Sequence, residues 1–238
     1  MAGWRVPLLT ELHAHATWSD GELTPRALVD LYGQAGFDVL AITDHVVESA
    51  RQECVRAETF AAYLDEIDAE AELARAVYGL LLVPGLELTV EDPDPSRAGH
   101  ALAIGLHRFV GVDDGLDEAL RQARAAGAAL VAAHPYPLAD AGLAARVTGR
   151  FAADPEWAAE AVDRFELFNR DEVFAWVAER RLPAVARGDF HFPEHRSSWK
   201  MLLSCLRHAE AVVDELRSRR PCAVTRFHGK GRSALRAA

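Results

Sequence analysis

The sequence predicts an α/β fold in one domain, and three observations support this prediction. Short apolar segments alternate with amphipathic helical segments about seven times, which is typical of parallel strands joined by helical crossovers. Half of the 238 residues are hydrophobic, which suffices for one large core. No linker divides the chain. We therefore expect one domain over residues 1–228 and a basic, frayed tail over 229–238.

The first half of the chain contains the clearest alternation. Thr24 and Pro25 open a helix, because threonine is a good N-cap and proline fits the first helical turn. Gly33 and Gly36 end this helix, and Gly79 stops a longer one. The expected strands cover residues 6–15, 38–43, 80–88 and 100–106, and two further helices cover 58–78 and 115–126.

The second half of the chain is less regular. Pro137 to Ala161 reads as a broken helix, interrupted by Gly142, Gly149 and Pro155. The other expected elements are strands over 128–133, 162–168 and 183–186, helices over 170–180 and 209–219, and an extended piece over 221–227. The run from Glu194 to Arg220 has no role that the sequence assigns.

Charge and cysteine content exclude several classes of protein. The formal net charge of −10 argues against a broad attraction to long nucleic acid or to an anionic membrane. No apolar run is long enough to span a bilayer, and the first residues lack a signal-peptide pattern. Cys54, Cys205 and Cys222 are odd in number and far apart, which indicates reduced thiols. We therefore expect a cytoplasmic protein; its oligomeric state stays open.

Histidine and carboxylate side chains follow the predicted strands. His13 and His15 stand two residues apart, so they point to one face of the first strand. Carboxyl ends of parallel barrel strands form the usual active-site rim. Residues at or just past such ends are His13, His15, His45, Glu87, His134, Asp189 and His191. A single histidine there is usually an ordinary loop residue, whereas the whole set indicates one site.

Imidazole and carboxylate are ligands that suit zinc, manganese and iron. His13 and His15 could bind one ion with Asp189, and Glu87 could bridge to a second ion, because a carboxylate deep on an apolar strand needs a partner. The second ion would also take His100 and His134, and a third would take Asp20, His45 and His191. We expect Asp44 to orient a ligand from outside this set. His100 stands at the start of its strand, so either this strand runs the other way or its boundary is misplaced.

Five motifs resemble those of the PHP (polymerase and histidinol phosphatase) superfamily. They are His13-Ala14-His15 with Ser19-Asp20-Gly21, Ile42-Thr43-Asp44-His45, Gly85-Leu86-Glu87, Ala133-His134-Pro135 and Gly188-Asp189-Phe190-His191. The resemblance runs from residue 9 to about 192. It implies a distorted (β/α)7 barrel, two or three divalent ions (Mn, Zn or Fe) and phosphoester hydrolysis. It also implies that His100, in Gly99-His100-Ala101-Leu102, is a ligand.

The leading hypothesis is a metal-dependent phosphoesterase or phosphatase that cleaves a small phosphoester, either a phosphomonoester or a short nucleotide. A metal-bridging hydroxide would be the nucleophile, because bound ions lower the pKa of water. The general acid is open between His191, His195 and a metal-bound water. Weak candidates for substrate contact are Asn169, Arg187 and Arg196. Arg187 also departs from the family pattern, in which many relatives have a small residue before the Asp-x-His motif.

Two alternatives remain beside phosphoester hydrolysis. One is hydrolysis of a non-phosphate ester or carbamate on the same metal centre. Amidohydrolases also begin with His-x-His, but their binuclear forms typically bridge the metals with a carboxylated lysine. The only lysines, Lys200 and Lys230, follow the last motif, so no strand lysine is expected in the barrel. The other alternative is a metal-binding module without catalysis.

Overall fold

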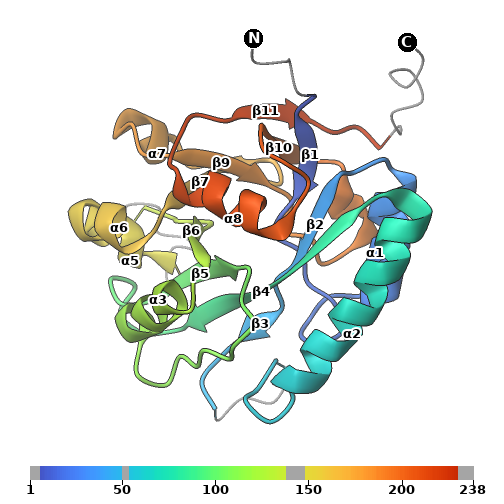
Figure 1. Ribbon diagram of the computed structural model, residues 1–238. Coiled ribbons are helices and arrows are strands. Elements are labelled where there is room, and N and C mark those ends of the chain that lie inside the picture. Colours follow the sequence, from blue (N-terminus) through green and yellow to red (C-terminus); the bar gives the residue numbers. More distant parts are fainter. Residues whose placement is uncertain (1–5, 50–53, 138–147, 230–238) are drawn as a thin grey trace.

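One curled sheet forms the centre of the protein, and most helices pack around its outside (Figure 1). The computed structural model describes residues 6–49, 54–137 and 148–229. Along the sheet the strand order is β11-β10-β1-β2-β4-β5-β6-β7-β8, while β3 pairs with β4 and β9 pairs with β7. Nearly all of the predicted tail lies outside the described residues. The mixed α/β class is confirmed.

Most of the predicted parallel strands are present. β1 (Leu8–Glu11), β2 (Val39–Ile42) and β4 (Leu81–Val90) pair in parallel, and the short β3 (His45–Val46) adds to β4. A second parallel set consists of β6 (Ala129–Ala133), β7 (Arg164–Asn169) and β9 (Ala184–Arg187). A bridge between Ala14 and Phe190 brings the ends of β1 and β9 together. Parallel strand ends therefore meet on one rim.

Four strands break the strict parallel alternation that the sequence predicted. β5 (Gly99–Ile104) is antiparallel to both β4 and β6, because a hairpin rather than a helix joins it to β4. β10 (Trp199–Leu203) is antiparallel to β1, and β11 (Ala223–Arg226) is antiparallel to β10. β8 (Glu172–Val173) forms a hairpin with β7. The reversal of β5 explains why His100 stands at the start of its strand.

The helices follow the predicted positions with local differences. In α1 (Pro25–Gln34) the Thr24 hydroxyl accepts the Ala27 N–H, as expected for an N-cap. α2 (Phe60–Leu73) continues as a π-helical turn, η1 (Ala74–Tyr78), and ends at Gly79, whose φ is 63°. The remaining helices are α3 (Leu116–Ala125), α5 (Arg150–Ala153), α6 (Pro155–Ala161), α7 (Ala175–Glu179) and α8 (Ala209–Arg217), and a 3-10 turn, η2, covers Pro193–Arg196.

Two of the predicted helices differ from the structure or extend beyond its described residues. The helix expected over 170–180 is wrong in its first half, because Arg170 has a φ of 50° and the chain turns there into β8 before α7 starts. Within the predicted broken helix, residues 138–147 lie outside the described part of the chain. The residues that follow them form α5 and α6, separated by Asp154 and Pro155.

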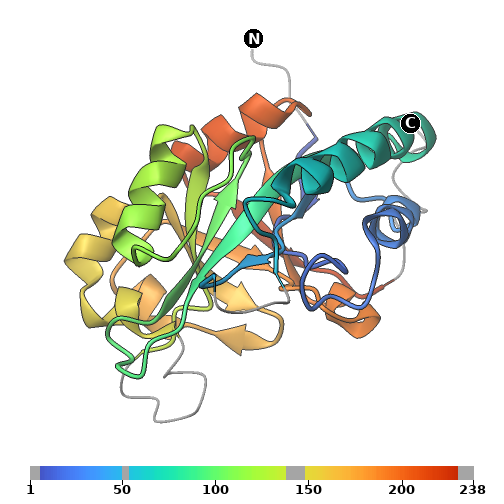
Figure 2. The ribbon, with the colours of Figure 1, turned by 90° about the horizontal axis from the view of Figure 1, so that it is seen from below.

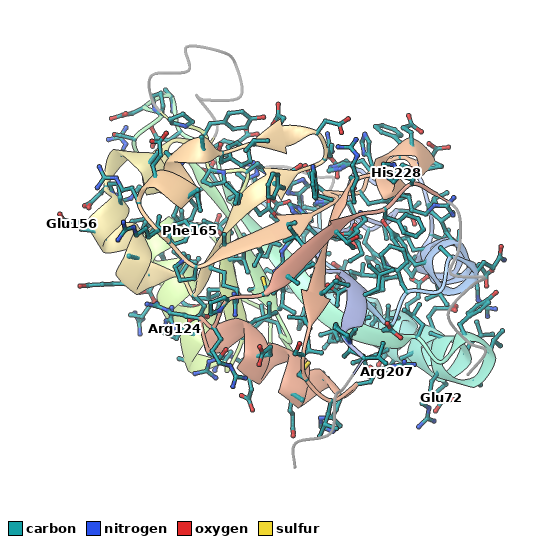
Figure 3. The ribbon with its side chains drawn as sticks, turned by 90° about the horizontal axis from the view of Figure 1, so that it is seen from above. Glu72, Arg124, Glu156, Phe165, Arg207 and His228 are labelled. Atoms are coloured by element: carbon teal, nitrogen blue, oxygen red, sulfur yellow. The ribbon has the colours of Figure 1, made fainter. Side chains whose placement is uncertain are left out.

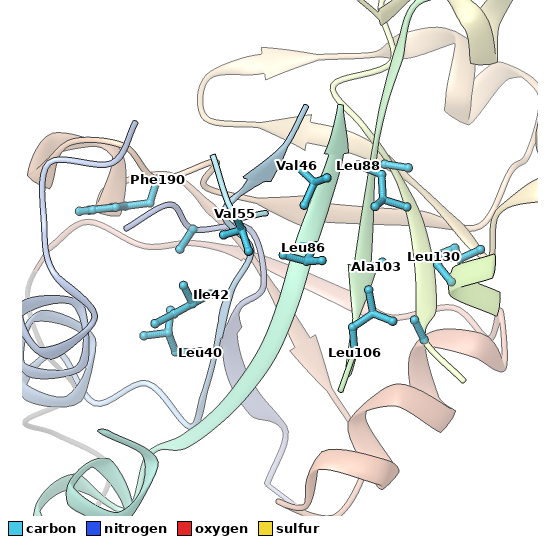
Figure 4. Close-up of a cluster of buried hydrophobic side chains, with 14 of the residues drawn as sticks. Leu40, Ile42, Val46, Val55, Leu86, Leu88, Ala103, Leu106, Leu130 and Phe190 are labelled. Carbon is cyan, nitrogen blue, oxygen red and sulfur yellow. The ribbon is translucent and has the colours of Figure 1, made fainter. Parts of the chain in front are cut away.

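Alternating strand residues divide the core between the two faces of the sheet. Leu40, Ile42 and Leu86 belong to the larger cluster, together with Phe190 (Figure 4). The same cluster contains apolar residues of α1 and α2. Val39 and Ala41 point to the other face, where a second cluster includes residues of α8. Viewed from below, helices flank the sheet on both sides (Figure 2). This double packing fixes the strand ends that carry the site.

Charged side chains lie on the outer side of the helices. Exposed side chains such as Glu72 on α2 and Glu156 on α6 project outward from the helical layer (Figure 3). In the described residues no helix is long and apolar enough to cross a membrane. The three cysteines are free thiols, as expected.

Candidate metal centre

Nine predicted residues meet at the rim where the parallel strands end. They come from the loops after β1, β6 and β9, from β3 and β4, and from the start of β5. Their nitrogen and oxygen atoms form four overlapping groups in which the atoms of each lie within 4.8 Å of one another. The residues are His13, His15, Asp20, His45, Glu87, His100, His134, Asp189 and His191.

Glu87 lies at the middle of this cluster and is fully buried. Its Oε1 lies 3.2 Å from His100 Nδ1 and 3.1 Å from His134 Nε2. Its Oε2 faces a different set, at 3.2 Å from His13 Nε2, 3.1 Å from His15 Nε2 and 3.3 Å from His45 Nδ1. The two oxygens of one carboxylate thus face two sets of imidazoles, which is the arrangement a bridging carboxylate requires.

A second carboxylate, Asp189, faces the first strand. Its Oδ1 lies 3.3 Å from His13 Nε2 and 3.6 Å from His15 Nε2, while Arg170 contacts its Oδ2 at 2.9 Å. Asp189 has a φ of 44°, and His134 has a φ of 28°. Both are non-glycine residues in the left-handed region, a strained conformation that often accompanies functional sites.

Asp20 gathers the outer part of the cluster. Its Oδ2 lies 3.3 Å from His191 Nε2, and its Oδ1 lies 3.7 Å from His45 Nε2 and 3.6 Å from His15 Nδ1. His15 therefore belongs with Asp20 as well as with His13. This differs from the sequence prediction, which separated Asp20 from the His13–His15 pair.

The donor set and its spacing fit divalent cations. Ligand atoms about 2.0–2.2 Å from one zinc ion lie about 3–3.5 Å from each other, close to the distances around Glu87. In the described part of the chain, His15 Nε2, His100 Nε2 and Asp189 Oδ1 are buried without a hydrogen-bond partner. Such orphaned atoms are costly unless something else binds them. A cation at the centre would satisfy His15 Nε2 and Asp189 Oδ1, which face Glu87 and His13 there.

The charge of the cluster also favours a cation. Burial raises the pKa of Glu87, but the surrounding imidazoles of His45 and His13 outweigh burial and hold that pKa well below its usual range. Burial lowers the pKa of His15 to about 3, so its imidazole is the neutral, metal-binding form. For His13, burial lowers the pKa, but Asp189, Glu87 and Glu166 together raise it well above its usual value. The buried carboxylates thus create a site for positive charge.

Asp44 lies beside the cluster and belongs to none of its four groups. Its Oδ1 accepts the Ala16 N–H at 2.9 Å and the Ser19 hydroxyl at 2.7 Å. Ser19 Oγ in turn lies 3.4 Å from His15 Nδ1. Burial raises the pKa of Asp44 to about 7. This chain connects the carboxyl group to a cluster imidazole through one hydroxyl.

A cavity of about 530 Å³ opens beside the cluster. Two residues of the cluster, His134 and Asp189, line it together with Tyr136, Arg170 and His195. His195 Nδ1 accepts the His191 N–H at 3.1 Å, so its other ring nitrogen is the available donor. The cavity is thus next to the candidate metal centre and can receive part of a substrate.

The comparisons with known proteins agree with this architecture. No family model matches the chain. A crystal structure of a two-domain protein from Bacteroides vulgatus, described as containing a predicted PHP-like metal-dependent phosphoesterase, superposes with a TM-score of 0.67 over 93% of this chain, at 22% identity. The chain covers 65% of that protein. The chain has a PHP-like fold.

Two further proteins are similar to this chain, one in structure and one in part of its sequence. An amidohydrolase from Chromobacterium violaceum, solved with bound sulfate and no metal, has a TM-score of 0.56 and 19% identity over 91% of this chain and 97% of its own. The 5′-3′ exoribonuclease Rnm of Escherichia coli is 35% identical over 89 residues. That match covers 37% of this chain and 25% of the exoribonuclease.

The three weak candidates for substrate contact differ in position within the PHP-like fold. Asn169 lines the cavity, and its amide donates to Glu166. Arg187 is fully buried and donates to the Leu12 carbonyl at 2.7 Å, so the expected substrate contact is wrong for this residue. Arg196 lies on η2 but is not among the residues that line the cavity.

Several residues that support the site were not predicted. Lys200 lies on β10 and is buried against Glu11 and Ser198, so the expectation that the barrel has no strand lysine is wrong. Its ammonium group pairs with Glu11 and not with the cluster. Glu166 on β7 contacts His13, and Arg170 contacts Asp189. A carboxylate inside an apolar strand, as in Arg164–Asn169, was the one signal that could have indicated Glu166.

Proposed function

We propose that the chain is a metal-dependent hydrolase of small phosphoesters, and that the nine clustered residues hold two or three divalent ions. The observation that carries this proposal is the division of the Glu87 carboxylate between two sets of imidazoles. One buried carboxylate that faces both sets suits a bridge between two ions. Manganese, zinc and iron all match the donor set.

Bound divalent ions would lower the pKa of water and offset charge on a phosphoryl group. The protein's own contribution is to hold these groups rigidly. Asp189 is fixed from outside by Arg170, whose Nη2 also lies 3.0 Å from His191 Nδ1. Preorganised groups of this kind need no rearrangement during the reaction.

The cavity beside the cluster would receive the leaving group. His195 can donate a hydrogen bond there through its free ring nitrogen, whereas His191 Nε2 faces Asp20 within the cluster. We therefore favour His195 over His191 as the residue that contacts the leaving-group oxygen. The exoribonuclease match keeps short nucleotides among the substrates, together with phosphomonoesters.

One assay separates this function from its rivals. The protein loaded with manganese is tested against p-nitrophenyl phosphate, bis(p-nitrophenyl) phosphate and p-nitrophenyl acetate. We expect turnover of at least one phosphate ester and its loss after chelation. Turnover of the acetate alone would favour the non-phosphate hydrolase, for which the amidohydrolase neighbour is the supporting observation. No turnover at full metal occupancy would favour a non-catalytic module.

A further inference from the structure

Two buried carboxylates lie beneath the cluster without belonging to any of its four groups. Glu11 is on β1 and Glu166 is on β7, and both are fully buried. Each accepts hydrogen bonds from two segments that carry cluster residues. Their contacts point to a role in positioning those residues.

Glu166 connects β1 to the end of β6. Its Oε1 lies 2.8 Å from His13 Nδ1, and its Oε2 accepts the His134 N–H at 2.8 Å. Because an ionised carboxylate only accepts hydrogen bonds, His13 Nδ1 carries a proton and its Nε2 faces Glu87 and Asp189. A carboxylate behind a metal-binding histidine fixes both the tautomer and the ring orientation.

Glu11 connects β1 to the end of β9. Its Oε1 accepts the N–H groups of Leu12, His13 and Gly188 at 3.1, 3.2 and 3.1 Å. Its Oε2 contacts Lys200, which is also fully buried. A Cβ on Gly188 would lie 2.3 Å from both Glu11 Oε2 and Lys200 Nζ, so any side chain at this position would displace the pair.

The backbone gives an independent reason for this arrangement. His134 and Asp189 have positive φ angles of 28° and 44°, and such strain persists only where the surroundings hold it. Glu166 binds the N–H of His134 itself, and Glu11 binds the N–H of Gly188, directly before Asp189. The two carboxylates therefore hold the two strained segments of the rim.

We propose that Glu11 and Glu166 are positioning residues for the group formed by His13, His134 and Asp189. Glu166 joins His13 to His134, and Glu11 joins His13 to Gly188, the residue directly before Asp189. A buried ion pair such as Glu11–Lys200 adds little net stability, so its value here is in fixing the rim. This inference rests on the metal centre of the proposed function.

The test is a titration of the metal-free protein with Mn²⁺, in which the electron paramagnetic resonance signal of free Mn²⁺ reports how much metal stays unbound. We expect Glu166→Gln to weaken the binding of one ion by about 10–100-fold, as is typical for loss of an outer partner of a metal ligand. The double variant Glu11→Leu/Lys200→Met should do the same. It removes both charges together, so no unpaired charge stays buried, and it decides the question if Glu166→Gln does not fold.

Matched controls come from two buried carboxylates that directly precede parallel strands, Asp38 before β2 and Asp163 before β7, at the ends of these strands away from the rim. Asp38 accepts the Leu9 N–H at 2.8 Å, and Asp163 accepts the Leu130 N–H at 2.8 Å. We expect Asp38→Asn and Asp163→Asn to lower thermal stability while Mn²⁺ affinity stays at the wild-type value.

Two results would overturn the positioning role: unchanged Mn²⁺ affinity in the rim variants, or an equal loss of affinity in the controls. No substrate is present in this titration. A protein that shows the expected affinities but cleaves no phosphoester would therefore contradict the proposed function alone. An active protein whose rim variants bind normally would contradict the positioning role alone.

Discussion

Replacement of Glu87 by alanine should remove more metal than any change at the edge of the site. Both carboxylate oxygens face imidazoles, Oε1 toward His100 and His134 and Oε2 toward His13, His15 and His45. Loss of an outer partner alone typically costs about 10–100-fold in metal affinity, so loss of a bridging ligand should cost at least about 100-fold for each of two ions.

The magnitude can be carried through to thermal stability. A 100-fold loss of affinity is about 2.7 kcal/mol per ion, or about 5 kcal/mol for two ions. With metal in excess, a loss of binding free energy lowers the free energy of unfolding by the same amount, because the metal binds only the folded state. For a chain of this size, each kcal/mol corresponds to about 2–4 °C, so Mn²⁺ should raise the Tm of Glu87→Ala by about 10–20 °C less than that of the wild type.

The matched control is His195→Ala, because His195 lines the cavity but belongs to none of the four groups. The assay is elemental analysis after metal loading and gel filtration, with thermal unfolding recorded in the presence and absence of Mn²⁺. We expect His195→Ala to retain close to the wild-type metal content. Equal metal content in both variants would refute the bridging role of Glu87.

Three further predictions concern single groups. Arg187→Met should destabilise the fold by about 3 kcal/mol in a denaturant titration, because the buried carboxylates of Glu166 and Glu11 lose a nearby positive charge. It should leave KM unchanged, and a raised KM at unchanged stability would contradict this. Arg170→Met should raise KM for p-nitrophenyl phosphate and weaken metal retention, since Arg170 lines the cavity and contacts Asp189; an effect on neither would remove Arg170 from the site. Because burial raises the pKa of Asp44 to about 7, the folded protein keeps a proton that the unfolded chain loses near pH 4. In the chelated protein, the contribution of Asp44 to the free energy of unfolding is therefore complete below about pH 4. Between about pH 4 and pH 7 this contribution falls by about 1.4 kcal/mol per pH unit. Asp44→Asn should abolish this slope, and urea titrations across the window would show whether the slope persists.

The sequence predicted the rim well because strand ends are readable from local patterns. The His13-x-His15 spacing and the apolar run before Glu87 both indicated side chains that share one edge. Strand direction is not contained in such patterns. An apolar segment looks the same in both directions, so the reversal of β5 and the place of His100 needed either tertiary pairing or the family resemblance.

The supporting residues were hidden for a different reason. Glu11, Glu166 and Lys200 lie in short strands, where a charged residue normally indicates a solvent-facing position. Their burial depends on partners far away in the chain, since Glu11 and Lys200 are 189 residues apart. Local composition carries no information about such pairing, and the same holds for β10, whose neighbours are β1 and β11.

In the β4–β5 hairpin, the position of the candidate ligand His100 does not depend on the length of the loop that joins the two strands. Glu87 and His100 lie on paired strands, and backbone hydrogen bonds fix their register whatever connects Val90 to Gly99. Longer exposed loops cost little free energy, since each doubling of loop length adds only about 0.6 kcal/mol. Residues 91–98 are therefore a point at which evolution or protein engineering can insert new segments over the rim and change the substrate range without rebuilding the metal centre.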